Sequence, residues 1–234
     1  MILAVRGMII GMKRTRLSDR ILPVYSRGEE IFNMVSHIVG GAIGITAIVL
    51  CSVFAGIKGD PYAVVSGVIF GFTMLLLYTM SSIYHGLKPD TSAKRIFQVI
   101  DHCSIFILIA GTYTPIALCT IREYNAAEGW ILFGVIWGIA LLGITLNSID
   151  LKKFKVFSMF CYLIMGWLIV VRINVLVQAV GIGPFWLLLS GGIAYTVGAL
   201  FYGLGKKKWF HSVFHIFCVA GSILHFLFIL LYVI

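Results

Sequence analysis

Long apolar runs separated by short polar connections dominate the chain. Residues 130–146, for example, carry no charged side chain over nearly the length that a helix needs to cross the hydrocarbon core of a membrane. The runs lack the alternation of apolar and polar residues that is typical of membrane-spanning strands. They predict seven membrane-spanning helices, at residues 33–55, 62–84, 97–120, 129–148, 156–173, 184–204 and 210–233.

The composition of the 234 residues excludes a soluble globular domain. Hydrophobic residues make up 60% of the chain and charged residues only 12%, whereas an average soluble domain has about 25% charged residues. We therefore expect an all-α integral membrane protein, with a basic cytosolic N-terminal tail over residues 1–27 and one seven-helix membrane domain over residues 28–234. Translation could start at Met1 or at Met12.

The positive charges favour one side of the predicted membrane domain. The net charge of +9 comes from cations that lie between the apolar runs, so they indicate membrane topology and not a nucleic-acid partner. Fifteen of the 18 Lys and Arg residues fall in the tail or in connections on the N-terminal side. The opposite side has only Lys58, Arg122 and Arg172. Because positively charged short loops stay in the cytoplasm, we expect a cytoplasmic N-terminus and an outside C-terminus.

The histidines gather on the predicted cytoplasmic side, where five of the six lie near the ends of spans. His211 and His215 are four residues apart, so both imidazoles project from one helix face. His85 closes the second span and can add a third nitrogen at the same depth. Three imidazoles with an open fourth position are typical of catalytic zinc sites. The alternative is that these histidines only form hydrogen bonds with lipid headgroups or water.

Acidic and polar residues lie beside these histidines. Asp101 opens the third span, where it could orient or deprotonate a metal's water; it could also cap that helix or pair with Lys94 or Arg95. His102 points about 100° away from Asp101 on a helix and is interpreted as an interfacial residue. The predicted supporting polar network consists of Glu30, Asn33, His37 and Ser81.

Four motifs together resemble one known family: E-I-F-N-M-V-S-H at residues 30–37, S-S-I-Y-H at 81–85, D-H-C-S-I-F-I-L-I-A-G-T-Y-T-P at 101–115 and H-S-V-F-H at 211–215. They look like the progestin and adipoQ receptor family, in its bacterial hemolysin III branch. The stretch G-G-I-A-Y-T-V-G-A-L-F-Y at 191–202 resembles that branch specifically.

The resemblance implies a multi-pass protein of the bacterial inner membrane with a zinc ion near the cytoplasmic face. His85, His211 and His215 match the zinc ligands of the family, and Asp101 matches the residue that contacts the metal's water. The eukaryotic relatives and the similar alkaline ceramidases imply zinc-dependent hydrolysis of a lipid amide, and the bacterial branch implies a role in membrane-lipid homeostasis. The long cytosolic domain of the eukaryotic receptors is missing, so hormone signalling is not expected.

Two alternatives to a lipid hydrolase stay open at this point. The first is a non-enzymatic membrane sensor in which structural zinc only clamps the helices together. The second is a pore-forming haemolysin. It fits the sequence less well, because a seven-span chain without a secretion signal should stay in its own inner membrane.

Overall fold

A computed structural model of the protein describes residues 14–204 and 207–234, and every regular element within them is a helix. The first half of the predicted basic tail, with the alternative start Met12, lies outside the described residues. The elements are η1 (Leu17–Asp19), α2 (Arg27–Lys58), α3 (Pro61–Gly86), α4 (Ser92–Pro115), the π-helical turn η2 (Ile116–Ile121), α5 (Arg122–Tyr124), α6 (Ala126–Trp167), η3 (Leu168–Arg172), α7 (Ile173–Val180), α8 (Ile182–Gly203) and α9 (Phe210–Tyr232).

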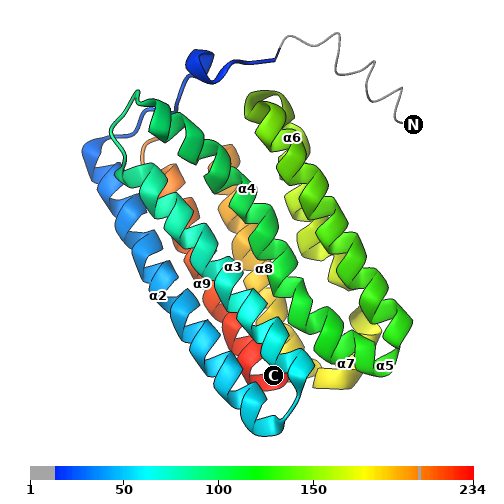
Figure 1. Cartoon of the computed structure of the whole chain (residues 1–234). Coiled ribbons are helices and arrows are strands. Elements are labelled where there is room, and N and C mark those ends of the chain that lie inside the picture. Colours follow the sequence, from blue (N-terminus) through cyan, green and yellow to red (C-terminus); the bar gives the residue numbers. More distant parts are fainter. Residues whose placement is uncertain (1–13, 205–206) are drawn as a thin grey trace, which may run out of the picture.

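Six helical segments of the described chain are long and apolar enough to cross a membrane, which confirms an all-α integral membrane protein. They comprise residues 27–58, 61–86, 92–124, 126–180, 182–203 and 210–232. The fourth segment has 55 residues and contains both of the spans predicted at 129–148 and 156–173. Figure 1 shows that α6 turns back on itself at one end of the bundle.

The turn within α6 is made by one residue, Asp150, whose φ of −157° and ψ of 93° are not helical. Its carboxylate accepts the N–H of Lys153 (3.2 Å), as a capping residue does at the start of a helix. Across the turn, the Ser158 hydroxyl donates to Asn147 Oδ1 (2.6 Å). The connection is thus much shorter than the gap predicted between residues 148 and 156.

Side-chain caps set where several helices begin. Ser26 and Glu29 form a reciprocal capping box at the start of α2. Thr91 accepts the N–H of Lys94, so α4 begins at Ser92, five residues before the predicted start at 97. Asp101 therefore lies in the third turn of α4, and the interpretation of Asp101 as a helix cap is wrong.

Glycines bring α2 and α3 into close contact along their length. A Cβ atom on Gly71 would lie 2.5 Å from the backbone nitrogen of Ile48, and one on Gly44 would lie 2.7 Å from the backbone nitrogen of Leu75. Small residues of this kind let membrane helices approach until their backbones touch. The contact places the first turns of α2 beside the last turns of α3.

Substituting Gly71→Ala is expected to destabilise the bundle by about 1–3 kcal/mol, because rigid backbone atoms of α2 would have to move. The change can be measured as a lower unfolding midpoint of the purified protein in detergent. Gly134→Ala is the matched control, since a Cβ atom on Gly134 meets nothing within 4 Å. Equal midpoints for the two variants would contradict the close contact.

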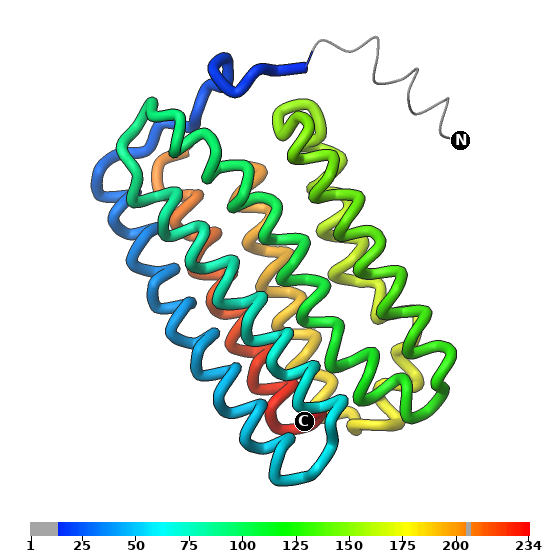
Figure 2. Tube along the Cα trace, in the orientation of Figure 1, coloured from blue at the N-terminus to red at the C-terminus, as the bar shows by residue number. Residues whose placement is uncertain are grey.

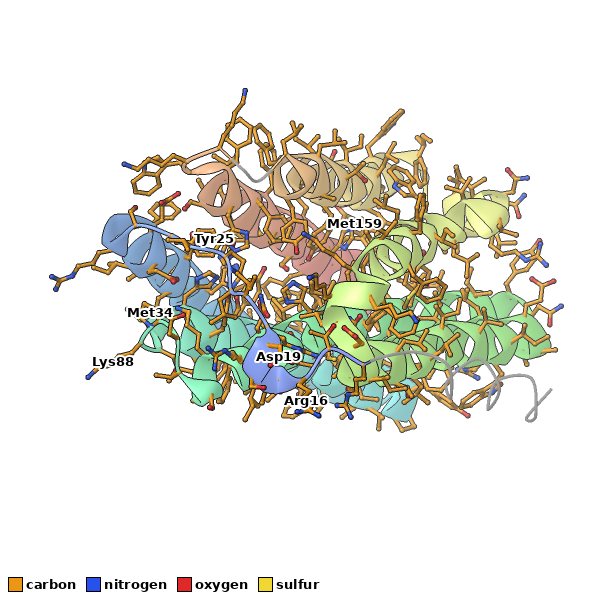
Figure 3. The ribbon with its side chains drawn as sticks, turned by 90° about the horizontal axis from the view of Figure 1, so that it is seen from above. Arg16, Asp19, Tyr25, Met34, Lys88 and Met159 are labelled. Carbon is orange, nitrogen blue, oxygen red and sulfur yellow. The ribbon has the colours of Figure 1, made fainter. Side chains whose placement is uncertain are left out.

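The chain before α2 lies across one end of the bundle. Figures 1 and 2 place this segment at the same end as the α3–α4 and α8–α9 connections and the turn of α6, with the C-terminus at the opposite end. In Figure 3, which looks down on this end, the segment from Arg16 through Asp19 to Tyr25 passes over the helices. It is held there in part by the Thr15 N–H, which donates to Asp150 Oδ2 (2.8 Å).

Candidate metal centre

Three buried histidines from two helices meet at this end of the bundle. His85 comes from the last turn of α3, and His211 and His215 from the first turns of α9; all three are at most 8% exposed. The His211 Nε2 atom lies 3.3 Å from His85 Nε2 and 3.0 Å from His215 Nε2. The three ligand atoms all lie within 4.8 Å of one another, so they could bind one metal ion.

The donor set fits zinc. Nitrogen ligands about 2.0–2.1 Å from a tetrahedral zinc ion stand roughly 3.3 Å apart, close to the two Nε2 separations of 3.3 and 3.0 Å. Neutral imidazoles are among the preferred zinc ligands. With three of them, one position of a tetrahedral site is left for water or substrate.

Glu30 on α2 fixes the orientation and the tautomer of His85. Its Oε2 atom lies 2.6 Å from His85 Nδ1. An ionised carboxylate can only accept hydrogen bonds, so Nδ1 carries the proton and the Nε2 lone pair faces the other two histidines. Carboxylates commonly orient the histidine ligands of metals in this way.

A buried lysine completes this interaction. Lys94 Nζ lies 2.7 Å from the other oxygen of Glu30 and donates to the backbone oxygen of Leu87 (3.0 Å). Lys94 is only 1% exposed. It joins α4 to α2, and Glu30 in turn joins α2 to His85. The suggested pairing of Lys94 with Asp101 is therefore wrong.

The first turns of α2 and α9 are tied directly to each other. The backbone N–H of Trp209, just before α9, donates to Glu29 Oε1 (2.6 Å). Glu29 precedes Glu30, and Trp209 lies two residues before His211. This hydrogen bond thus holds the start of α9, with two of the histidines, beside the helix that orients the third.

The remaining residues of the predicted supporting network are buried in α2 and α3. The His37 ring stacks on His215 with 3.8 Å between centroids and packs edge-on against Tyr78. Asn33 is fully buried one turn before His37, and Ser81 is buried one turn before His85. The structure thus brings Glu30 and His37 into contact with candidate ligands, whereas Asn33 and Ser81 are buried one helical turn away from His37 and His85.

Asp101 and His102 lie in the third and fourth turns of α4 and are not members of the cluster of three histidines. The Asp101 carboxylate is 3.8 Å from His102 Nδ1 and close enough to the hydroxyls of Tyr84 and Tyr202 to interact electrostatically. His102 Nδ1 donates to the Gln98 backbone oxygen (2.8 Å), and Nε2 lies 3.1 Å from the Tyr202 hydroxyl. Both ring nitrogens of His102 are therefore used within the protein.

Sequence reasoning missed one aromatic side chain that covers the centre. Tyr25, in the segment before α2, stacks on His211 with ring centroids 4.8 Å apart and an interplanar angle of 19°. Burial raises the pKa of Tyr25, so the phenol stays protonated. The sequence pattern placed Tyr25 in the predicted basic cytosolic tail, and nothing in the residues around it indicates this long-range contact.

Two cavities share part of their lining, and one of them reaches the histidine cluster at His211. One of about 220 Å³ lies under the segment before α2 and is lined by residues that include Tyr25 and His211. The other, of about 150 Å³, is largely apolar and extends between α4, the second half of α6, α8 and α9. The residues common to both linings are His102, Leu151, Lys155 and Tyr202.

The chain is similar to known proteins over most of its length. The sequence profile of the family described as haemolysin-III related matches residues 25–226. Hemolysin-3 of Bacillus cereus is 38% identical over 205 residues, which cover 88% of this chain and 92% of that protein. The Hemolysin-3 homolog of Bacillus subtilis (strain 168) is 38% identical over 204 residues, 87% of this chain and 94% of that protein.

A more distant similarity extends to mammals. The monocyte to macrophage differentiation factor of Homo sapiens is 24% identical over 187 residues, which cover 78% of this chain and 76% of that protein. The matched region of the family profile includes all three histidines, the whole of α2 and α3, and most of α9.

Proposed function

The chain belongs to the hemolysin III branch of the progestin and adipoQ receptor family, and from this premise we propose that it is a zinc-dependent hydrolase acting on an amide bond of a membrane lipid. Its role would be membrane-lipid homeostasis in the bacterial inner membrane. The observation that carries the proposal is the cluster of three histidines, one of which, His211, lines a cavity that shares part of its lining with a largely apolar cavity. A lipid could place its polar bond beside the histidines and its chain between the helices.

The proposed topology has seven spans and a cytoplasmic N-terminus. A straight helix of the 55 residues 126–180 would be roughly 80 Å long at 1.5 Å per residue, far more than the hydrocarbon thickness of about 30 Å. The non-helical backbone at Asp150 supports two spans here. The described Lys and Arg residues support the orientation, because most lie in the segment before α2, in the α3–α4 and α8–α9 connections, and near the turn of α6.

In this proposal the zinc is held by His85, His211 and His215 and acts as a Lewis acid when bound. Glu30 keeps the His85 Nε2 lone pair available, as its hydrogen bond to Nδ1 requires. A carboxylate oxygen of Asp101 accepts the proton of the attacking water and returns it to the leaving nitrogen. The apolar cavity binds the lipid chain and excludes bulk water from the reacting bond.

Asp101→Asn tests the catalytic role. The variant is expected to keep its zinc and to release fatty acid from ceramide more slowly by a factor of about 10²–10⁴, because it lacks the proton acceptor. Activity is measured with purified protein in lipid nanodiscs, and zinc by elemental analysis. Asp90→Asn, in the exposed α3–α4 connection, is the matched control and should behave as the unchanged protein.

Two outcomes would contradict the hydrolase. One is stoichiometric zinc with no turnover of any ceramide or phospholipid by the unchanged protein. The other is a strain carrying Asp101→Asn whose lipid composition equals that of its parent. The second result would favour a sensor with structural zinc, which the sharing of the histidines between α3 and α9 also supports.

A further inference from the structure

A buried arginine faces the cavity that adjoins the histidines. Arg20, in the segment before α2, is only 8% exposed and contributes to the lining of this cavity of about 220 Å³. Its Nε and Nη1 atoms are buried and have no hydrogen-bond partner among the described residues. Burying donors of a charged group without a partner is costly, so a guanidinium in this position is suited to a ligand that accepts hydrogen bonds.

The side chains that line the cavity together with Arg20 carry a net positive charge. Lys152 and Lys155, just after the turn of α6, line the same cavity, and none of its described lining residues is acidic. The carboxylate of Asp150 interacts electrostatically with Arg20. Both oxygens of Asp150 already accept backbone N–H groups, of Thr15 and Lys153. The cavity therefore favours an anion.

The lining of this cavity and the apolar cavity next to it together indicate the kind of anion. A guanidinium presents parallel N–H donors that match two oxygens of a phosphate group, and lysines nearby add positive charge. The cavity shares His102, Leu151, Lys155 and Tyr202 with the apolar cavity between the helices. A ligand that filled both would have an anionic head and an apolar chain.

We propose that Arg20, with Lys152 and Lys155, binds the phosphate group of an anionic phospholipid whose chain enters the apolar cavity. Bound in this way, the lipid's polar bonds lie next to His211, which also lines the cavity. The proposal rests on the proposed function only for the idea that an amide-linked lipid with such a phosphate group is a substrate; phosphatidylglycerol serves as a probe of phosphate binding alone. Binding of the phosphate itself needs neither zinc nor turnover.

The test compares Arg20→Gln with Arg16→Gln in the purified full-length protein. Arg16 is the matched control, since it lies in the same segment, carries the same charge and is exposed. Binding is measured in detergent by native mass spectrometry with three probes: short-chain phosphatidylglycerol, the uncharged diacylglycerol of the same chain length, and inorganic phosphate. The zinc content of each sample is determined in parallel.

Phosphatidylglycerol is expected to bind the unchanged protein and Arg16→Gln alike, and Arg20→Gln at least about tenfold more weakly. Arg20→Lys keeps the charge but loses the paired donors, so its affinity for phosphatidylglycerol should lie between those of the unchanged protein and Arg20→Gln. This intermediate affinity would show that the loss of binding in Arg20→Gln is not caused by misfolding. Diacylglycerol should bind more weakly than phosphatidylglycerol, and its binding should be the same with and without the Arg20 side chain.

Three results would overturn the proposal. An equal loss of phosphatidylglycerol binding in Arg20→Gln and Arg16→Gln would mean that only surface charge attracts the lipid. Equal binding of diacylglycerol and phosphatidylglycerol would mean that the phosphate is not recognised. Arg20-dependent binding of inorganic phosphate at the same affinity as the lipid would assign the site to a soluble anion. A protein that lacks zinc but binds phosphatidylglycerol through Arg20 would instead contradict the proposed function alone.

Discussion

Replacing His211 by alanine is expected to remove the metal from the purified protein. The Nε2 atom of His211 lies 3.3 Å from that of His85 and 3.0 Å from that of His215. Without His211, only the imidazoles of His85 and His215 remain as candidate ligands. Two protein ligands are fewer than zinc sites of either the structural or the catalytic kind use. Elemental analysis after gel filtration should find about one zinc ion per chain in the unchanged protein and almost none in His211→Ala.

His102→Ala is the matched control for this experiment. His102 lies at the same end of the bundle, but its two ring nitrogens interact with the Gln98 backbone oxygen and the Tyr202 hydroxyl. The variant should therefore keep its zinc. Retention of zinc by His211→Ala, or its loss from His102→Ala, would place the metal elsewhere in the protein.

Glu30→Gln is expected to lower both the stability of the protein and its affinity for the metal. The substitution leaves Lys94, with a side chain 2% exposed, without its counterion. Removing one partner of a buried ion pair costs about 3–5 kcal/mol. It also removes the carboxylate that orients His85, and loss of such a partner typically weakens metal binding by about 10–100-fold.

A second substitution separates the two effects. Adding Lys94→Met to Glu30→Gln removes the unpaired charge, so thermal stability should recover in large part while zinc affinity stays low. Glu128→Gln is the control, because Glu128 pairs with Arg172 where both side chains are at least 32% exposed, and an exposed pair contributes about 0–1 kcal/mol. If Glu128→Gln were as destabilising as Glu30→Gln, burial of the Glu30 pair would not be the cause.

The residues that the sequence identified are those with a local signal. Four-residue spacing placed His211 and His215 on one helix face, and the depth of His85 in its apolar run placed it near them. The structure brings these three together. Glu30, Asn33 and His37 are spaced three and four residues apart, so their place on one helix face also follows from the sequence, whereas the contact of Glu30 with His85 does not.

The residues that the sequence missed act through contacts between distant segments. Lys94 was counted as one more loop cation, yet it is buried against Glu30, 64 positions earlier. Tyr25 and Arg20 lie in a polar stretch that resembles a solvated tail until it is folded across the helix ends. The connection between the spans predicted at 129–148 and 156–173 was expected, but its shortness was not, since one capping carboxylate, that of Asp150, replaces the glycines or prolines that usually mark a connection.

X-ray absorption at the zinc edge of the purified protein tests the metal centre most directly. A zinc ion bound by His85, His211 and His215 should give three imidazole nitrogens at about 2.0–2.1 Å and one further oxygen or nitrogen neighbour. The His211→Ala protein should lose this spectrum. Sulfur neighbours at about 2.3 Å, or a zinc ion with fewer than three imidazoles, would contradict a centre built from these three histidines.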